Sequence, residues 1–544
     1  MTQETDILDC CIVGAGPAGL QAAYLLRKKG LRVKLLERGD GVSGFFRKFP
    51  RHRNFISINK VHTGLDDADA RLRYDWNSLL NDEGLEVRDF TKRYFPKADD
   101  YVRYLERFAE TLEEEIVLNA DVCRISKTDD VFTLACADGR RFDARHVVVS
   151  SGVTQPWLPD VEGVELTENY MDFDATQERF DNKRVLILGK GNAAFETAQK
   201  MIEHAAAIHV MSPNPIKFAW NTHFVGHVRA VNTQFIDTYQ LKSQNAVVDA
   251  NPVRIERDGD TYLVHARMTA AEDHEIVLRY DHVICCTGFR WDASILDADI
   301  RPALRHFDKF PEMTPQWEAK STPNLWFAGT IMQSRDFKKT MSGFVHGFRH
   351  NIAALAHFIA ERATGAALPS DRIDVDGPAL VDTIIDRISL SSAMFLQPGF
   401  LGDVIHVGGP QAGTRYRDMP VQWLAENPAF LSEDALVVTL EFGNFGDTPT
   451  HVKRAHTAYE GEPDPFIHPV IRHYRAGECV GQVHLSDHLD ADWRRIDDKE
   501  ETAGTVTAMT FADLGQTLPI AEVVRAQIDG FLTTQGLRTA LAAE

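Results

Sequence analysis

The chain opens with an alternation of elements that is visible in its hydrophobic pattern. Residues 7–13 form an apolar stretch of strand length, and a glycine-rich turn then leads into a helical pattern over residues 20–29. A second apolar stretch, residues 31–36, ends at the acid Glu37. Short apolar stretches beside a helical period are typical of buried parallel strands and the helix that connects them. The pattern predicts a βαβ unit at the start of the chain.

A second copy of this pattern lies further along the chain. Residues 183–188 predict a strand, 195–205 a helix and 207–211 the next strand. Three more apolar strands, at 145–151, 281–287 and 324–328, each run into a glycine, and a helix is expected from near Gly343 to about residue 362. Strands that alternate with helices predict a doubly wound α/β fold with parallel sheets.

The first glycine turn has the residues that a dinucleotide-binding site needs. Its sequence is Gly14-Ala15-Gly16-Pro17-Ala18-Gly19. In such a turn Gly14 permits the tight bend, Gly16 lets the backbone approach a pyrophosphate and Gly19 permits close packing of helix and strand. The helix N-terminus attracts the phosphates, and Glu37 can accept hydrogen bonds from a ribose diol. The turn therefore predicts a dinucleotide site.

The second glycine turn, Gly189-Lys190-Gly191-Asn192-Ala193-Ala194, has alanine at its third glycine position. The strand that follows ends at Ser212 rather than at an acid, and Lys190 and Lys217 lie nearby in the sequence. An acid at this point would hold a 2′-hydroxyl group and repel a 2′-phosphate. Its absence favours NADP over NAD.

Two dinucleotide sites on one chain predict a flavoprotein that accepts a hydride from a nicotinamide. The expected FAD-binding domain comprises residues 1–165 and 285–368, and the NADP-binding domain, residues 180–284, is inserted into it. Residues 366–377 mix Pro, Asp and Gly and predict a linker. A C-terminal α+β domain, 378–544, follows, with strands expected at 436–442, 470–475 and 505–511 and helices at 379–388 and 520–532. Its role is left open among core stabilisation, a lid, a partner site and a homodimer interface.

Charge and composition exclude several classes of protein. The 544 residues include 59 basic and 79 acidic side chains, a net charge of −20, so binding to a nucleic-acid backbone is not expected. No apolar stretch reaches the length of a membrane span. The N-terminus is polar and acidic and does not look like a signal peptide, so a cytoplasmic location is expected. Seven cysteines are too few for a disulfide framework.

Longer stretches carry a family resemblance. The two glycine turns without a Cys-x-x-Cys between them resemble the flavin-containing monooxygenase superfamily. The chain resembles more closely the FAD-dependent oxidoreductase domain-containing protein 2 group, which includes an endoplasmic-reticulum flavoprotein. That resemblance lies in residues 45–60, 74–80, 220–241, 334–349 and 466–474. The group's eukaryotic member carries a secretion signal and a retention tail, which are not found here, in keeping with a cytoplasmic protein.

The resemblance implies FAD and NADPH as cofactors and a set of residues that bind them. The expected cofactor-binding residues are Gly14, Gly16, Pro17, Ala18, Gly19, Glu37, Arg38, Phe45, Phe46, Arg47, Trp76, Val122, Ser151, Gly152, Gly189, Gly191, Asn192, Ala193, Ser212, Lys217, Thr287, Gly288, Gly329, Gly343 and Phe344. The N-terminus of the helix expected after Gly343 can stabilise charge at the N1–C2=O edge of a flavin.

The expected reaction is NADPH-dependent oxidation of a nitrogen or sulfur centre in a small metabolite by molecular oxygen, through a C4a-hydroperoxyflavin. Asn77 resembles an asparagine near the flavin of monooxygenases and is the expected catalytic hydrogen-bond donor. Asn77 can equally bond its own backbone in a turn. The alternative function is an FAD-dependent NADPH oxidoreductase that passes electrons to a protein or a quinone-like acceptor.

Several other clusters have two interpretations. The basic cluster Arg47, Lys48, Arg51, His52 and Arg53 is either a solvated face or a contact for cofactor phosphate or an anionic substrate. A second basic patch comprises Arg335, Lys338 and Lys339. Convergence of the two patches would favour an acidic substrate.

The remaining candidates are interpreted as structural. The adjacent pairs Cys10-Cys11 and Cys285-Cys286 lie in apolar strands and are expected to be buried, which disfavours a disulfide reductase. His346 and His350 are expected to be a surface pair on a helix, and the acidic segment 487–492 a solvated loop. No metal site is expected.

Overall fold

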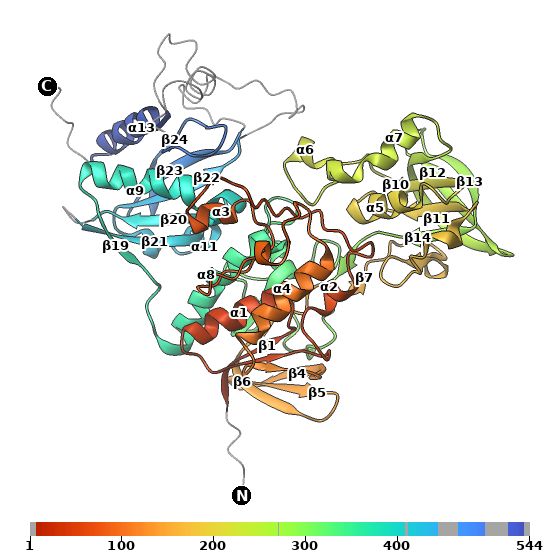
Figure 1. The fold of residues 1–544 in the computed structure, drawn as a ribbon. Coiled ribbons are helices and arrows are strands. Elements are labelled where there is room, and N and C mark those ends of the chain that lie inside the picture. Colours follow the sequence, from red (N-terminus) through yellow and green to blue (C-terminus); the bar gives the residue numbers. More distant parts are fainter. Residues whose placement is uncertain (1–6, 270, 409–411, 444–465, 495–519, 538–544) are drawn as a thin grey trace, which may run out of the picture.

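The computed structural model describes residues 7–269, 271–408, 412–443, 466–494 and 520–537. Three sheets organise this part of the chain, and Figure 1 shows them as three neighbouring regions. The N-terminal region, coloured red to orange, holds the first glycine turn. The yellow region on the right holds the second turn, and the cyan and blue region is the C-terminal domain.

The first sheet is parallel at its centre. Its strands run in the order β3-β2-β1-β6, with β18 also paired to β6, and β6 continues into the antiparallel β5 and β4. These strands are β1 (Leu8–Val13), β2 (Val33–Leu36), β3 (Ile116–Val117), β4 (Val122–Thr128), β5 (Val131–Cys136), β6 (Arg141–Val149) and β18 (Leu325–Phe327). The carboxyl ends of β1, β2 and β6 meet at one edge, where a ligand binds in open α/β sheets.

Helices of this region come from both ends of its sequence. They are α1 (Pro17–Lys28), α2 (Gly44–Lys48), α3 (Ala68–Leu72), α4 (Ala98–Glu110) and α8 (Val345–Thr364), with short 3₁₀ turns η1 (Val87–Asp89) and η5 (Gly329–Ser334). Helix α8 packs along α1 although more than 300 residues separate them. The chain returns to the first sheet in β18, and α8 follows that strand.

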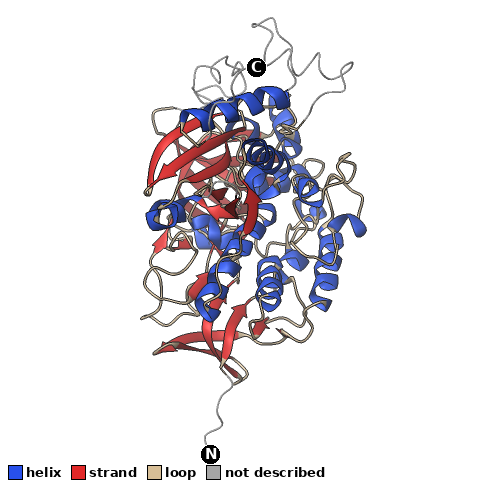
Figure 2. Cartoon of the chain, turned by 90° about the vertical axis from the view of Figure 1, so that its left-hand side faces the viewer, coloured by secondary structure: helices blue, strands red, loops and turns tan. Residues whose placement is uncertain are grey.

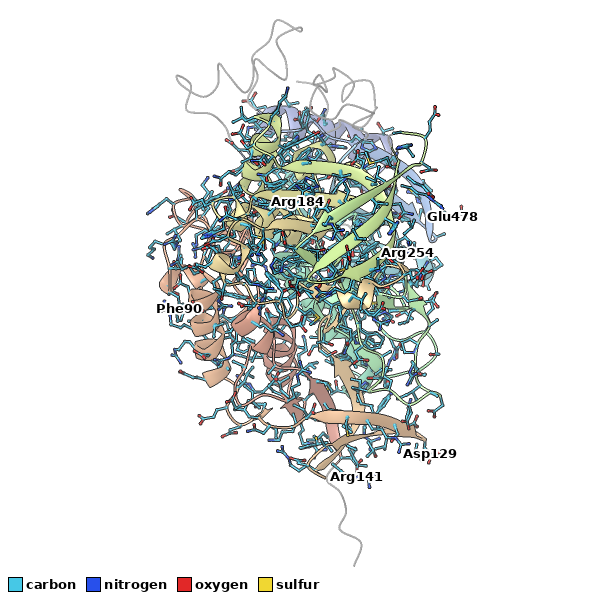
Figure 3. The ribbon with its side chains drawn as sticks, turned by 90° about the vertical axis from the view of Figure 1, so that its right-hand side faces the viewer. Phe90, Asp129, Arg141, Arg184, Arg254 and Glu478 are labelled. Carbon is cyan, nitrogen blue, oxygen red and sulfur yellow. The ribbon has the colours of Figure 1, made fainter. Side chains whose placement is uncertain are left out.

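The second sheet has the order β13-β12-β11-β10-β9-β14-β8. Its strands are β8 (Glu168–Asn169), β9 (Arg184–Leu188), β10 (Ala207–Ser212), β11 (Ala246–Asp258), β12 (Thr261–Met268), β13 (His274–Tyr280) and β14 (His282–Cys285). Figure 3 shows this sheet face-on, with Arg184 and Arg254 on its strands. Because β8 pairs with β14, the sheet begins before the expected domain boundary at residue 180.

The helices of the second region are short. They are α5 (Asn192–Met201), α6 (Ala219–Thr222) and α7 (Gln234–Gln240), with 3₁₀ turns η2 (Val164–Leu166), η3 (Gln177–Phe180) and η4 (Ala230–Asn232). The two chain crossings between the regions pair with each other as β7 (Gln155–Pro156) and β15 (Phe289–Arg290). A small hairpin, β16 (Leu304–Arg305) and β17 (Phe310–Pro311), lies just beyond this crossing.

The C-terminal domain is built on an antiparallel sheet of order β19-β21-β20-β22-β23-β24 (Figure 2). The strands are β19 (Asp371–Asp374), β20 (Leu401–His406), β21 (Ala412–Pro420), β22 (Ala435–Glu441), β23 (His468–Arg475) and β24 (Glu478–His484). The helices are α9 (Gly377–Leu390), α10 (Ser392–Leu396), α11 (Val421–Glu426) and α13 (Ile520–Thr534), with the 3₁₀ turn η6 (Pro428–Leu431).

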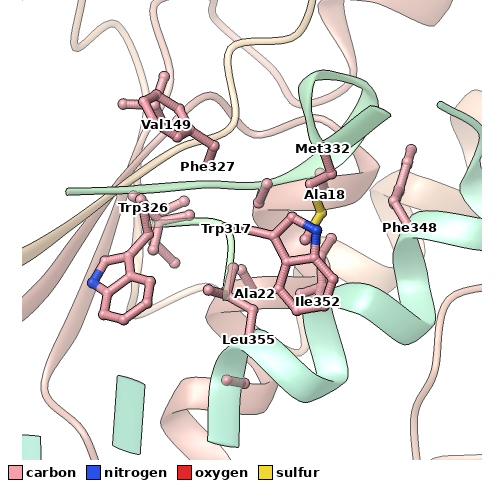
Figure 4. Packing of buried hydrophobic residues seen from close by; sticks show 14 of the residues in the cluster. Ala18, Ala22, Val149, Trp317, Trp326, Phe327, Met332, Phe348, Ile352 and Leu355 are labelled. Carbon is pink, nitrogen blue, oxygen red and sulfur yellow. The ribbon is translucent and has the colours of Figure 1, made fainter. Parts of the chain in front are cut away.

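Close packing joins α1, α8 and the end of the first sheet (Figure 4). Trp317 and Trp326 are fully buried there, and Ile352 and Leu355 of α8 belong to the same cluster. Burial of such large side chains contributes roughly 1.5–3 kcal/mol each, so this cluster fixes α8 against the glycine turn of α1.

The predicted elements are confirmed with small shifts of their ends, with two exceptions. The expected linker 366–377 contains β19, which pairs with β21, because its alternating residues complete the sheet edge. The strand expected at 505–511 lies outside the described residues. Among the described helices, none combines the length and apolar character needed to cross a bilayer.

Candidate functional site

The first glycine turn has little room except on one side. Gly14 adopts a φ of +99°, and a Cβ there would lie 3.0 Å from the carbonyl oxygen of Ser150. A Cβ on Gly19 would lie 2.0 Å from the carbonyl oxygen of Gly14, so α1 and β1 pack too closely for any side chain. A Cβ on Gly16 meets nothing within 4 Å. The open side beside Gly16 is the place that a pyrophosphate needs.

Glu37 closes the adenosine end of this turn. Its Oε2 accepts the N–H of Ala15 at 2.8 Å, and its Oε1 accepts the N–H of Gly39 at 2.9 Å. The backbone N–H of Ala120, two residues before Val122, donates to the carbonyl oxygen of Glu37 at 2.7 Å. The carboxylate therefore lies beside the glycine turn, while Arg38 points into solvent.

Ser150 is a residue of this site that the sequence prediction missed. Its Oγ lies 2.8 Å from the carbonyl oxygen of Val13 and 2.9 Å from that of Gly14. The predicted Ser151 and Gly152 follow directly after β6, and a Cβ on Gly14 would also approach Ser151 Cα at 3.1 Å. Ser150 directly precedes the predicted Ser151 in the sequence, and this position at the end of the strand could have indicated it.

Gly329 completes the first site from a distant part of the chain. A Cβ on Gly329 would lie 2.6 Å from the Cβ of Ala18 in the first turn of α1, next to Pro17. Thr330 Oγ1 then donates to the carbonyl oxygen of Gly343 at 3.2 Å, just before Phe344 caps α8. The structure thus brings the predicted residues of 14–19, 37, 151–152, 329 and 343–344 to neighbouring positions.

The second glycine turn has the same geometry. Gly189 has a φ of +114°, and a Cβ there would lie 2.4 Å from the carbonyl oxygen of Cys286. Gly191 meets nothing within 4 Å, and α5 begins after it without an acid in its first turn. Thr287 and Gly288 pass beside this turn, where Gly288 accepts the N–H of Trp157 at 2.9 Å. This site is open to an anionic group in the same way as the first.

Asn192 holds a loop of the second domain in place. Its Nδ2 donates to the carbonyl oxygen of His227 at 2.8 Å, and its Oδ1 accepts the N–H of Arg229 at 2.9 Å. Ala193, next to it, is partly buried. Asn192 thereby couples the start of α5 to a loop that faces the first domain.

Lys190 was expected to lie near the 2′-phosphate of NADP, but its side chain has partners within the protein. Its Nζ forms an ion pair with Asp249 and donates to the carbonyl oxygens of Ser212 and Asn214, each at 3.0 Å. The lysine is committed to the protein, so Ser212 and the exposed Lys217 are the residues left near the end of β10.

An aromatic cluster lies where the loop 224–229, which Asn192 holds, meets the start of α8. Trp76 stacks on His346 with ring centroids 4.4 Å apart, and Phe344 flanks His346 at 5.6 Å. Arg229 lies over the Trp76 ring at 5.3 Å, and Phe224 contacts Phe344 at 5.9 Å. Residues of both nucleotide-binding domains therefore meet at the N-terminus of α8.

His346 is neutral in this cluster, because burial and the charges of Arg349 and Arg229 hold its pKa well below the usual value. The expectation of a surface pair is wrong: His346 and His350 are both buried, since α8 packs on all sides. Asp487 and His488 are buried as well, so the predicted solvated loop is also wrong there.

Asn77 is buried next to Trp76. Its Nδ2 donates to the carbonyl oxygen of Ile58 at 3.0 Å, which occupies one of its two N–H groups. Asp75 builds the turn, because its Oδ1 accepts the N–H groups of Asn77 and Ser78 at 2.9 and 3.0 Å. The structure places Asn77 in a buried turn beside Trp76, and its position near a flavin and its catalytic role stay predictions.

The first basic cluster is engaged with the protein. Arg47 donates to the carbonyl oxygen of Val42 and forms an ion pair with Glu106 at 2.5 Å, and Arg51 donates to the carbonyl oxygen of Phe173. Burial lowers the pKa of His52 to about 4. The contacts of Arg47 lie within the first domain, and the bond of Arg51 to Phe173 joins this segment to the second region.

Two aromatic residues of the same segment, Phe45 and Phe46, were expected to bind a cofactor. The ring of Phe46 packs against Phe55 and Tyr101, whereas Phe45 is exposed and contacts Phe289 of the chain crossing at 6.4 Å. Phe46 therefore packs against the hydrophobic core. Phe45 lies exposed beside the place where the chain crosses between the two nucleotide-binding domains.

The second basic patch meets different partners from the first. Arg335 Nη1 donates to the carbonyl oxygen of Met313 at 2.9 Å, and its Nη2 donates to Gln422 of the C-terminal domain. The charge of Lys217 acts on Lys338 instead. Arg335 is thus directed to the C-terminal domain, whereas Lys338 lies toward the second domain.

The paired cysteines are buried and form no disulfide. Burial raises the pKa of Cys11 to about 12 and also raises the pKa of Cys10, Cys285 and Cys286. Protonated, buried thiols are poor nucleophiles. The prediction of buried structural cysteines is confirmed.

A cavity of about 270 Å³ lies at the crossing between the two domains. The residues that line it are Gln155, Pro156, Trp157, Leu158, Arg290, Phe307 and Asp308. It adjoins Gly288 at the edge of the second dinucleotide site through Trp157.

This fold, with two glycine turns on two parallel sheets, defines an oxidoreductase with two dinucleotide-binding sites. The family model described as pyridine nucleotide-disulphide oxidoreductase matches residues 11–329. The chain is 32% identical over 520 residues to FAD-dependent oxidoreductase domain-containing protein 2 of Danio rerio, covering 86% of this chain and 75% of that protein. The chain belongs to the pyridine nucleotide-disulphide oxidoreductase family and, within it, groups with FAD-dependent oxidoreductase domain-containing protein 2.

Two further similarities are more distant. Over 290 residues the chain is 26% identical to a ferredoxin–NADP reductase of Streptococcus agalactiae, covering 52% of this chain and 74% of that one. A flavin-containing monooxygenase from Stenotrophomonas maltophilia shares the fold with a TM-score of 0.51 at 19% identity, covering 66% of this chain and 100% of that chain. The family confirms the predictions of an FAD-dependent oxidoreductase and of FAD and NADPH as its cofactors.

Proposed function

We propose that this protein is an NADPH-dependent FAD monooxygenase that oxidises a nitrogen or sulfur centre of a small metabolite with molecular oxygen. The observation that carries the proposal is the pairing of two open glycine turns with two adjacent cysteine pairs that are buried and protonated. Neither pair offers an accessible dithiol to electrons from NADPH, which supports oxygen as the acceptor.

The first site fits FAD through the open side of Gly16 and the acid Glu37, and the second fits NADPH through Gly191 and Ser212. When bound, the flavin supplies the activation of oxygen, and the protein supplies orientation and exclusion of water. Trp76, Phe344 and the neutral His346 form an apolar wall that excludes water at the N-terminus of α8. The second N–H of Asn77 remains for a hydrogen bond to reacting oxygen.

The alternative is an NADPH oxidoreductase that passes electrons to a protein or a quinone-like acceptor. It is favoured by the similarity to ferredoxin–NADP reductase, which extends over half of this chain. In that case Phe45, exposed beside the domain crossing, lies where an acceptor can approach.

A stopped-flow experiment separates these functions. The FAD-loaded protein is reduced anaerobically with NADPH and mixed with oxygen. A monooxygenase gives a transient absorbance before the spectrum of oxidised flavin returns. In a reductase the oxidised spectrum returns in a single phase, and hydrogen peroxide is formed. Asn77→Asp should keep FAD and its reduction by NADPH but shorten the transient. A wild-type protein without any transient contradicts the proposal.

A further inference from the structure

Three lysines of different segments gather at the seam between the two nucleotide-binding domains. Lys217 follows β10, Lys309 begins the return of the β16–β17 hairpin, and Lys338 precedes α8. The charge of Lys338 acts on Lys309 and on His227, and the charge of Lys217 acts on Lys338 and on the same histidine. Three segments that are far apart in the sequence thus each contribute a lysine to the boundary between the two nucleotide-binding domains.

Ring contacts show how these segments come together. His306 of the hairpin stacks on Phe337 with centroids 4.5 Å apart, which brings the hairpin that carries Lys309 against the segment that carries Lys338. The loop that begins at Lys217 is paired with Val228, whose N–H donates to the Lys217 carbonyl oxygen at 2.9 Å. Through Phe224 this loop reaches Phe344, six residues after Lys338.

Lys309 is fixed beside the second dinucleotide turn. Its Nζ lies 4.1 Å from the centroid of the Trp157 ring, and a Cβ on Gly288 would lie 3.9 Å from it. The tip of the hairpin before it, residues 306–308, consists of three residues with φ between 57° and 61°. Three consecutive left-handed residues without glycine are costly, and such strain is concentrated at functional sites.

Lys309 differs from the other two lysines in being half-buried. Within the described ranges, none of the three forms a salt bridge, so no acid offsets the burial of the Lys309 charge. Asp308 is directed to the neighbouring cavity, which it lines with Arg290. Partial burial and the charge of Lys338 lower the pKa of Lys309 to about 8. A half-buried cation without an acidic partner costs free energy, and a bound anion would remove that cost.

We propose that Lys217, Lys309 and Lys338 form a binding site for a small oxyanion, a phosphate or a carboxylate. Lysine is a point-charge donor that suits such groups, and a partly buried setting strengthens the attraction. The anion is either the 2′-phosphate of NADPH or an acidic group of the substrate. Its use in turnover rests on the proposed function, but binding of the anion does not.

The first test measures binding of inorganic phosphate to the FAD-loaded full chain by titration calorimetry. Lys309→Met and Lys338→Met should each weaken phosphate binding about tenfold, or about 1.4 kcal/mol. Lys60→Met is the matched control, because Lys60 is an exposed lysine that also lies over an aromatic ring, that of Tyr74. Lys338 is exposed, so its variant keeps the fold, and retained FAD absorbance verifies this for each variant.

The second test identifies the source of the anion. Flavin reduction is titrated anaerobically with NADPH and with NADH. If the coenzyme supplies the phosphate, Lys338→Met raises the Kd for NADPH about tenfold and leaves that for NADH unchanged. If the substrate supplies a carboxylate, both coenzymes bind as to wild type while phosphate binding is still weakened.

The proposal is overturned if wild type does not bind phosphate, or if both lysine variants bind it as Lys60→Met does. Failure of the proposed function gives a different result, since a protein that NADPH does not reduce can still be titrated with phosphate.

Discussion

The Nη1 atom of Arg349 lies 2.7 Å from the carbonyl oxygen of Ser78, which ties α8 to the loop that contains Trp76 and Asn77. The same guanidinium also donates to the carbonyl oxygens of Asp75 at 2.9 Å and Leu72 at 2.7 Å. Arg349 is fully buried. One side chain of α8 therefore sets the position of the loop on which the predicted catalytic residue lies.

Arg349→Met should unfold the protein readily, because three buried carbonyl oxygens lose their donor. Each unsatisfied group costs about 1–3 kcal/mol, so a loss of at least about 3 kcal/mol in the free energy of unfolding is expected. Urea titration measures this loss. Arg103→Met, at an exposed ion pair with Asp100, is the control and should cost less than about 1 kcal/mol. Equal effects of the two variants would show that Arg349 does not hold the loop.

Gly16→Ala and Gly19→Ala should separate binding from folding. The methyl group on Gly16 meets no protein atom, so the fold is kept, but it occupies the space of the pyrophosphate and should raise the Kd for FAD at least about tenfold. The methyl group on Gly19 meets the carbonyl oxygen of Gly14 and should prevent folding. Circular dichroism and FAD fluorescence report the two effects. A Gly16→Ala protein that keeps wild-type FAD affinity would show that the turn does not bind the pyrophosphate.

Ser212→Glu should change the choice of coenzyme. A carboxylate at the end of β10 repels a 2′-phosphate and accepts hydrogen bonds from a ribose diol, so the ratio of kcat/KM for NADPH over NADH should fall about tenfold or more. Ser243→Glu introduces the same charge at an exposed position of the second domain and should leave the ratio unchanged. An unchanged ratio in Ser212→Glu would exclude this strand end as the 2′-phosphate position.

Stability should fall as the pH is lowered from 7 to 5. Burial lowers the pKa of His52, His146 and His357 to about 4, whereas an unfolded histidine titrates near 6.5. Between these values the unfolded state binds more protons, so acid favours unfolding by up to about 2 kcal/mol for each such histidine at pH 5. Urea midpoints at pH 7 and 5 measure the loss. His146→Gln should have a smaller difference between the two pH values, and an equal difference would contradict this assignment.

The sequence predicted the local chemistry of the two glycine turns. Gly14, Gly16 and Gly19 act within six residues, and Glu37 ends the next strand, so their spacing alone specifies the site. The buried cysteine pairs were also predicted correctly, because apolar strands of a parallel sheet are covered on both faces.

Other parts of the site depend on contacts between distant segments. Gly329 against Ala18, Trp76 against His346 and Lys309 over Trp157 are pairs separated by more than 100 residues, and no local period marks them. The prediction that His350 lies at the surface was wrong for the same reason. The C-terminal domain covers that face of α8, where Ser392 contacts His350. The chain sequence thus determined which segments form the two glycine turns predicted to bind dinucleotides, since turn and strand geometry are local. Only the tertiary structure decided which side chains surround the reacting centre, because that depends on how three sheets pack together.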